Sequence, residues 1–144
     1  DEPVSALDVS VQAKILNLLE DMKARYELSL VFISHDLSVV RNVSDRVVVM
    51  YLGKICEVGG ADRLYDAPAH PYTRALLASA PEPAQSVGVA DAVLGDDLPS
   101  PTDPPSGCRF RTRCPLAIDR CATEEPLMQE IDEDHFVACH LPST

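Results

Sequence analysis

The chain opens with the sequence DEPVSALD, residues 1–8, in which two adjacent carboxylates precede a short loop and a third carboxylate. Ser5 and Asp8 have the spacing of a helix capping box, and Asp8 is itself a suitable N-cap. Two acids at a strand-to-loop junction suit phosphoryl transfer, because one can hold Mg²⁺ while the other orients or deprotonates the attacking water. This stretch therefore predicts the start of a helix and a site for phosphate chemistry.

The residues after this stretch predict a helix and then a strand. Apolar side chains at helical spacing (Val11, Ile15, Leu18, Leu19 and Met22) indicate an amphipathic helix that ends near Tyr26. Residues 28–33 are apolar and rich in β-branched side chains, so we expect a buried strand there. His35 follows that strand, at the end where α/β sheets place their ligands. An Asp-Glu pair or a single histidine is more often an ordinary surface or loop feature, and only their joint occurrence at this spacing indicates a site.

Further elements complete an α/β pattern. The sequence predicts a helix over residues 37–43 with Asp36 as its cap, a strand over 46–52, a turn at Gly53-Lys54 and a partner strand over 55–58. Two more helices are expected over 61–66 and 72–80, with Pro71 in the first turn of the second. The fold class is therefore α/β with buried strands.

Composition and charge divide the chain. It has 46% hydrophobic residues and a net charge of −11, which disfavours nonspecific binding to nucleic acid or an anionic membrane. Residues 1–82 carry a net charge of −4 and residues 83–144 one of −7. No apolar run has the length that crosses a bilayer, so we expect a soluble or peripheral protein with no nucleic acid partner.

Three regions follow from this pattern. Residues 1–80 hold the α/β elements, and residues 81–105 are rich in Pro, Asp, Ser and Ala, as in a linker. Residues 106–144 hold four cysteines and little periodicity, so they lack the apolar residues for a core of their own and need a cross-link.

Several motifs resemble those of ABC-type ATPases. Residues 1–2 and 5–8 are similar to the end of the Walker B motif and the D-loop, and VFISHD, residues 31–36, is similar to the switch strand with its H-loop histidine. MYLGKI, residues 50–55, resembles a hairpin of importer ATPases. HPYTRALL, residues 70–77, resembles a segment of the dipeptide/oligopeptide/nickel importer subfamily.

The resemblance implies a role for each matched residue. Asp1 would bind Mg²⁺, Glu2 would act as general base or orient the water, and His35 would donate to the γ-phosphate of ATP. Ser5 and Asp8 would lie in the D-loop, at the interface of two nucleotide-binding domains. The implied fold is the C-terminal part of a RecA-like ABC nucleotide-binding domain.

The resemblance also implies a function and a location. The intact protein would be the ATP-hydrolysing, energy-coupling subunit of a bacterial peptide importer, peripheral on the cytoplasmic face of the plasma membrane. Its partners would be a second ATPase subunit, membrane permease subunits and, indirectly, an extracytoplasmic solute-binding protein. The family's Walker A loop, Q-loop and signature sequence have no counterpart in these 144 residues, so we expect this chain alone to be inactive.

Four cysteines in the last region indicate a metal site. Cys108, Cys114, Cys121 and Cys139 are spaced C-x5-C-x6-C-x17-C, without the tight C-x2-C pairs that are usual in zinc sites. A 4Fe–4S cluster spreads its ligands more widely, and the resemblance independently implies one in this extension. Zn²⁺ and no metal at all remain alternatives, with His135 and His140 as reserve ligands. A free-standing iron–sulfur or zinc module is the alternative function, although it would have no need for the motifs of residues 1–36.

Overall fold

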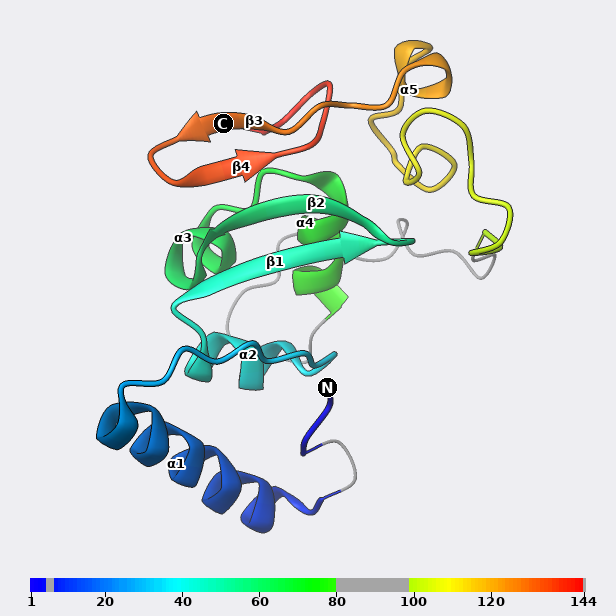
Figure 1. Cartoon of the computed structure of the whole chain (residues 1–144). Coiled ribbons are helices and arrows are strands. Elements are labelled where there is room, and N and C mark those ends of the chain that lie inside the picture. The colour runs from blue at the N-terminus through cyan, green and yellow to red at the C-terminus, as the bar shows by residue number, and fades with distance from the viewer. Residues whose placement is uncertain (5–6, 80–98, 144) are drawn as a thin grey trace. The chain divides into compact units, whose positions relative to one another are not determined.

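The computed structural model describes residues 1–4, 7–79 and 99–143. The chain divides into two compact units, Asp1–Asp45 and Arg46–Thr144. The first unit holds helices α1 (Val9–Tyr26) and α2 (Leu37–Val43), and the second holds all strands of the described residues, as Figure 1 shows. None of the helices in the described part of the chain combines the length and the apolar character that crossing a membrane requires.

Both helices of the first unit begin where the sequence predicts. The Asp8 carboxylate accepts a hydrogen bond from the Val11 N–H at 2.9 Å and so caps α1. Asp36 caps α2 in the same way, accepting from the N–H groups of Ser38 and Val39. The predicted capping contribution of Ser5 lies outside the described residues.

The buried strand predicted over residues 28–33 is wrong for this structure. The segment forms no strand, and the Val31 side chain is 92% exposed. A parallel strand requires hydrogen-bonded neighbours. Two backbone bonds join the described segment to the rest of its unit, from Glu2 N–H to the Ile33 carbonyl at 2.8 Å and from Leu28 N–H to the Lys23 carbonyl at 3.1 Å, and neither belongs to a strand ladder. Apolar composition is therefore not sufficient to make this segment a buried strand.

The second unit begins with the predicted hairpin. Strands β1 (Arg46–Tyr51) and β2 (Lys54–Gly60) pair antiparallel around Leu52 and Gly53, which both have positive φ as a type I′ turn requires. Side chains of β1 alternate between exposed and buried, so this strand has one covered face instead of the two expected from its continuous apolar sequence. Helices α3 (Ala61–Asp66) and α4 (Pro71–Ser79) confirm the other two predicted helices (Figure 1).

The last region joins the sheet, which its sequence did not reveal. It contains α5 (Arg120–Thr123), β3 (Gln129–Asp132) and β4 (His135–Val137). Strand β4 pairs antiparallel with β2, and the sheet order is β1-β2-β4-β3. The α/β class is confirmed, but the sheet is antiparallel throughout.

A shared aromatic core explains how a region poor in apolar residues is held. Phe110 is 1% exposed, and its ring lies 5.2 Å from that of Tyr51 and 5.3 Å from that of Tyr72. Cys56 of β2 and Ala75 of α4 belong to the same cluster. The hairpin and α4 therefore supply the apolar surface that residues 106–144 lack.

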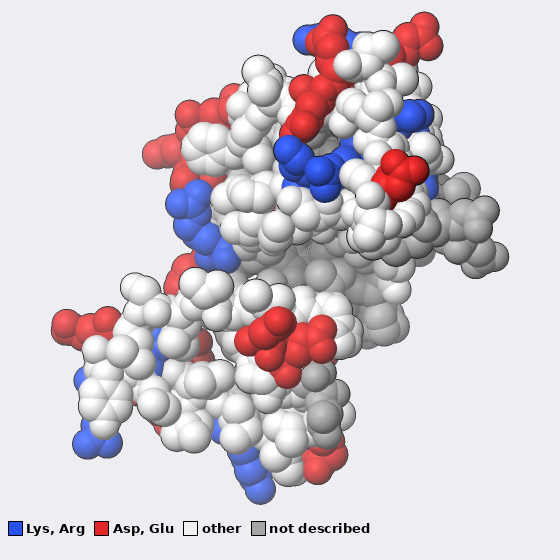
Figure 2. Space-filling model, turned by 45° about the vertical axis from the view of Figure 1, so that its right-hand side comes forward, with Lys and Arg blue, Asp and Glu red and all other residues white. Residues whose placement is uncertain are grey.

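Exposed ion pairs add to these contacts. Arg46 pairs with Asp134 at 2.9 Å, Lys54 with Glu125 at 2.7 Å and Arg63 with Asp132 at 3.1 Å. On the face that Figure 2 shows, basic groups lie among acidic ones. Exposed pairs of this kind stabilise little, so the buried contacts of the second unit dominate its stability.

Candidate functional site

The structure brings Glu2 and His35 together at the edge of the first unit. The Glu2 N–H bonds to the Ile33 carbonyl, which places residue 2 beside the end of the 28–33 segment. His35 Nδ1 then lies 2.8 Å from Glu2 Oε1. Glu2 has a φ of 43°, a left-handed conformation that is uncommon outside glycine and that clusters at functional sites. Two residues that the sequence selects separately thus form one contact.

The electrostatics of this contact favour a positively charged imidazole. The hydrogen bond to Glu2 raises the pKa of His35 above its ordinary value, and the charge of Glu2 adds to this effect. When protonated, the ring donates through Nδ1–H to Glu2 and keeps an Nε2–H that can donate to an oxyanion. The pair can therefore present a positively charged donor and a carboxylate in one place.

The other residues predicted for this site are not part of the contact between Glu2 and His35. Asp1 is exposed next to Glu2 and carries the type of oxygen ligand that Mg²⁺ prefers. The Asp8 carboxylate caps α1 and is held by that hydrogen bond. Ser5 lies outside the described residues.

We expect the His35 contact to depend on pH. Because its pKa in the folded chain is raised above 6.5, the contact stabilises the fold fully below about pH 6.5 and is lost as the pH rises through the raised pKa. A histidine ring titration by NMR should show the pKa of His35 falling in Glu2→Gln. An unchanged His35 titration in that variant would contradict the contact.

The four predicted metal-ligand cysteines line one pocket of the second unit. Cys108, Cys114, Cys121 and Cys139 share this pocket with residues that include His140. All four thiols are free. Cys108 N–H donates to the Cys121 carbonyl at 2.8 Å, and Gly107, with a φ of 62°, permits this approach because a Cβ there would lie 2.4 Å from that oxygen. The tertiary fold thus collects thiols from distant positions.

Burial favours the neutral form of three of these thiols. Burial raises the pKa of Cys139 to about 11 and also raises the pKa of Cys108 and of Cys114. A metal would therefore have to displace protons on binding. Among the described residues, no three His, Cys, Asp or Glu side chains are placed to hold a single metal ion. The four thiols share a pocket without converging on one point.

Some of the reserve ligands and arginines line the cysteine pocket, and others do not. His140 lines the cysteine pocket and lies 3.1 Å from the Glu124 carbonyl through Nε2. His135 is not among the residues that line this pocket and pairs elsewhere. Arg111 lines the pocket, whereas Arg120 pairs with Glu124.

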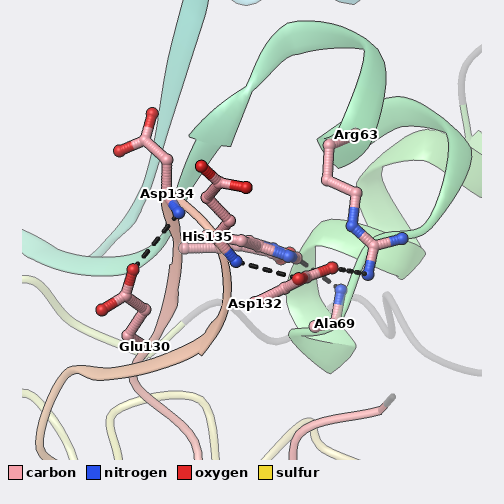
Figure 3. Close-up of polar contacts among 8 residues, drawn as sticks. Arg63, Ala69, Glu130, Asp132, Asp134 and His135 are labelled. Carbon is pink, nitrogen blue, oxygen red and sulfur yellow. Dashed lines mark hydrogen bonds and ion pairs between the residues drawn. The ribbon is translucent and has the colours of Figure 1, made fainter.

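Sequence reasoning missed a buried polar cluster around Glu57. This side chain of β2 is 0% exposed, and its carboxylate accepts from Ala69 N–H at 2.8 Å and His70 N–H at 2.9 Å. His135 Nε2 lies 2.7 Å from Glu57 Oε1 and must be the donor to the carboxylate. Figure 3 shows His135 close to Ala69, beside the pair of Arg63 and Asp132. In the sequence, the feature that could have indicated this cluster is one acidic residue, Glu57, inside an apolar strand.

His70 has a structural role in the same cluster. Its Nδ1 accepts from the Tyr72 N–H at 3.0 Å, so it caps α4 as a helix-start residue. Burial lowers the pKa of His70 to about 4, which keeps the ring neutral.

Comparison with known proteins gives a consistent result. The family described as "Oligopeptide/dipeptide transporter, C-terminal region" matches residues 56–121. The chain is 55% identical over 139 residues to a peptide import ATP-binding protein of Brucella ovis. It is 55% identical over 145 residues to the oligopeptide transport ATP-binding protein AppF of Bacillus subtilis, and 52% identical over 141 residues to a peptide ABC transporter ATP-binding protein of Sinorhizobium fredii.

These similarities cover nearly all of this chain and part of each relative. The three alignments include 96%, 99% and 98% of the chain. The chain spans 44% of the length of the first two relatives and 40% of the third.

Proposed function

We propose that the chain is the C-terminal part of a peptide-importing ABC ATP-binding protein, a subunit that hydrolyses ATP to drive peptide import. The observation that carries the proposal is the contact between Glu2 and His35 at 2.8 Å. It joins two motifs that are 33 positions apart in the sequence. In this proposal residues 1–80 are part of a RecA-like nucleotide-binding domain and residues 106–144 are its C-terminal extension, joined by the linker 81–105.

The proposed mechanism assigns the chemistry to three side chains. Asp1 would hold Mg²⁺, which neutralises the developing phosphate charge. Glu2 would orient or deprotonate the attacking water, and His35 would donate Nε2–H to the γ-phosphate, where positioned donors stabilise the transition state most. The Glu2–His35 hydrogen bond raises the pKa of this donor and so favours its charged form.

The proposal extends to the assembly. Ser5 and Asp8 would contact a second ATPase subunit, and Asp8 is the residue that caps the start of α1. Permease subunits, and through them an extracytoplasmic solute-binding protein, would complete the importer. The subunit would then be peripheral on the cytoplasmic face of the membrane. The names of the three relatives support this assignment over a free-standing metal module.

The activity of the 144-residue chain tests this proposal. Without a backbone cradle and lysine for the phosphates, the purified chain should show no specific ATP hydrolysis. Phosphate release with and without Mg²⁺ is the measurement. Robust Mg²⁺-dependent turnover by the chain itself, abolished in Glu2→Gln, would contradict the proposal that hydrolysis needs a phosphate-binding loop in addition to these residues.

For the cysteine pocket we propose a 4Fe–4S cluster, with Zn²⁺ as the alternative. Cys108, Cys114, Cys121 and Cys139 would be the ligands. One observation supports this proposal: the four thiols, which are the ligand type of iron–sulfur clusters, line one pocket. The group would act as a cross-link in a region that has few apolar residues.

Anaerobic reconstitution with ferrous iron and sulfide tests the cysteine assignment. We expect brown protein with absorbance near roughly 400 nm, as thiolate-bound iron–sulfur centres show, and loss of this band in Cys114→Ser. Cys56→Ser is the matched control, because Cys56 lies in β2 outside the proposed ligand set. Stoichiometric zinc without a visible band would instead select the alternative.

A further inference from the structure

We propose that Glu57 and His135 are positioning residues for the cysteine pocket. Their buried contact would hold the strand that leads to Cys139 opposite the other three cysteines. This inference rests on the proposed metal function of these cysteines. It concerns residues outside the ligand set, and its test separates the two proposals.

Cys139 depends on strand β4 for its position. It follows β4 by two residues, and β4 pairs with β2 through only two residue pairs, Glu57 with Val137 and Val58 with Phe136. The backbone bond from Ala138 N–H to the Cys56 carbonyl, at 2.8 Å, extends this short ladder. Because so few ladder bonds hold β4, its position needs a further anchor.

The contact of Glu57 with His135 supplies that anchor. Both side chains are almost fully buried, with exposures of 0% and 1%. The same carboxylate accepts from the N–H groups of Ala69 and His70, so one group ties β4 to β2 and to the start of α4. Displacing β4 would leave a buried carboxylate short of a donor, which is costly, whereas the exposed pair of Arg63 and Asp132 can be solvated.

The fit of the imidazole is specific to this position. A Cβ at Gly59 would lie 3.2 Å from His135 Cδ2, so the absence of a side chain there lets the ring lie against β2. His70 links the cluster to the pocket. Its backbone bonds to Glu57, its ring lines the pocket, and it hydrogen-bonds to the backbone of Ala138, next to Cys139.

The other three ligands are positioned by different contacts. Cys108 and Cys121 are joined by the backbone bond that Gly107 permits, and Cys114 lies in the loop between them. The contact of Glu57 with His135 thus positions only one of the four proposed ligands, Cys139. Losing it should weaken metal retention while the loop of the other three remains folded.

The experiment compares iron retention in variants of the 144-residue chain. Wild type, His135→Leu and His135→Gln are reconstituted anaerobically with ferrous iron and sulfide, and iron loss to an excess of chelator is followed. We expect about tenfold faster loss in His135→Leu, the lower end of the range for changes behind metal ligands. His135→Gln should recover much of the retention, because its amide nitrogen can reach Glu57.

Two controls separate positioning from general destabilisation. Val47→Ala removes buried volume from β1, which is not paired with β4, and Arg63→Ala removes an exposed contact with β3. Both should retain iron as wild type does. Hydrogen exchange should show faster exchange in β4 of His135→Leu with the hairpin still protected, which confirms a folded variant.

Each outcome decides the inference. Faster iron loss in His135→Leu, with rescue in His135→Gln and no change in the controls, supports it. Equal retention in wild type and His135→Leu overturns it and leaves the metal site intact. Equal loss in Val47→Ala overturns it in favour of a general stability effect. A folded wild-type chain that takes up no iron overturns the cluster proposal and this inference together.

Discussion

In the longer protein proposed above, Glu2→Gln is expected to lower kcat for ATP hydrolysis by about 10²–10⁴-fold, the usual contribution of a general base. The amide keeps the shape of the carboxylate but cannot take a proton from water. ATP binding should persist, because the substitution would leave the phosphate-binding loop of that longer protein unchanged. Phosphate release measures kcat, and equilibrium binding of labelled ATP measures the retained affinity.

A surface acid provides the control for this prediction. Glu20 is exposed on α1, and Glu20→Gln makes the same chemical change away from His35. It should leave kcat unchanged. If Glu2→Gln hydrolyses ATP at the wild-type rate, Glu2 is not the base and the assignment from the sequence motif is wrong.

The elements that the sequence predicts well are those fixed by local chemistry. The caps Asp8 and Asp36 begin α1 and α2 at the predicted residues, since each satisfies N–H groups a few positions ahead. The β1–β2 hairpin is also local, because a two-residue turn brings its strands together. Such features need no information about distant residues.

The strand that was predicted wrongly and the strand that was not predicted both depend on partners distant in the sequence. Residues 28–33 have the composition of a buried strand, yet all of them except the half-buried Phe32 are exposed, because no described strand pairs with them. Residues 129–132 have the reverse problem: their sequence is largely polar, and they form β3 because β4 is already paired with β2. Tertiary pairing overrides strand propensity in each case.

The candidate site shows the same division. Glu2 and His35 could be selected because each belongs to a recognisable motif, and the structure adds their contact of 2.8 Å. Glu57 could not be interpreted from the sequence, because its partners come from residues 69–70 and from His135, which is 78 positions away. A charged residue in an apolar strand signals a buried partner without identifying it.

Glu57→Ala is expected to destabilise the second unit by about 3 kcal/mol or more, because each buried donor left unsatisfied costs about 1–3 kcal/mol. The substitution leaves Ala69 N–H, His70 N–H and the His135 ring without their shared acceptor in a buried position. Chemical denaturation followed by near-ultraviolet circular dichroism would measure this, because Tyr51 and Tyr72 pack in the core of the same unit.

Two comparisons identify the origin of this loss. Glu57→Gln keeps an oxygen acceptor and should cost less than Glu57→Ala, because part of the hydrogen bonding survives. Arg63→Ala breaks an ion pair in which both side chains are about half exposed, and it should cost less than about 1 kcal/mol. A Glu57→Ala loss no larger than that of Arg63→Ala would mean that water replaces the carboxylate. The tail would then be held by Phe110 and its aromatic neighbours, and the buried carboxylate would be dispensable for the fold.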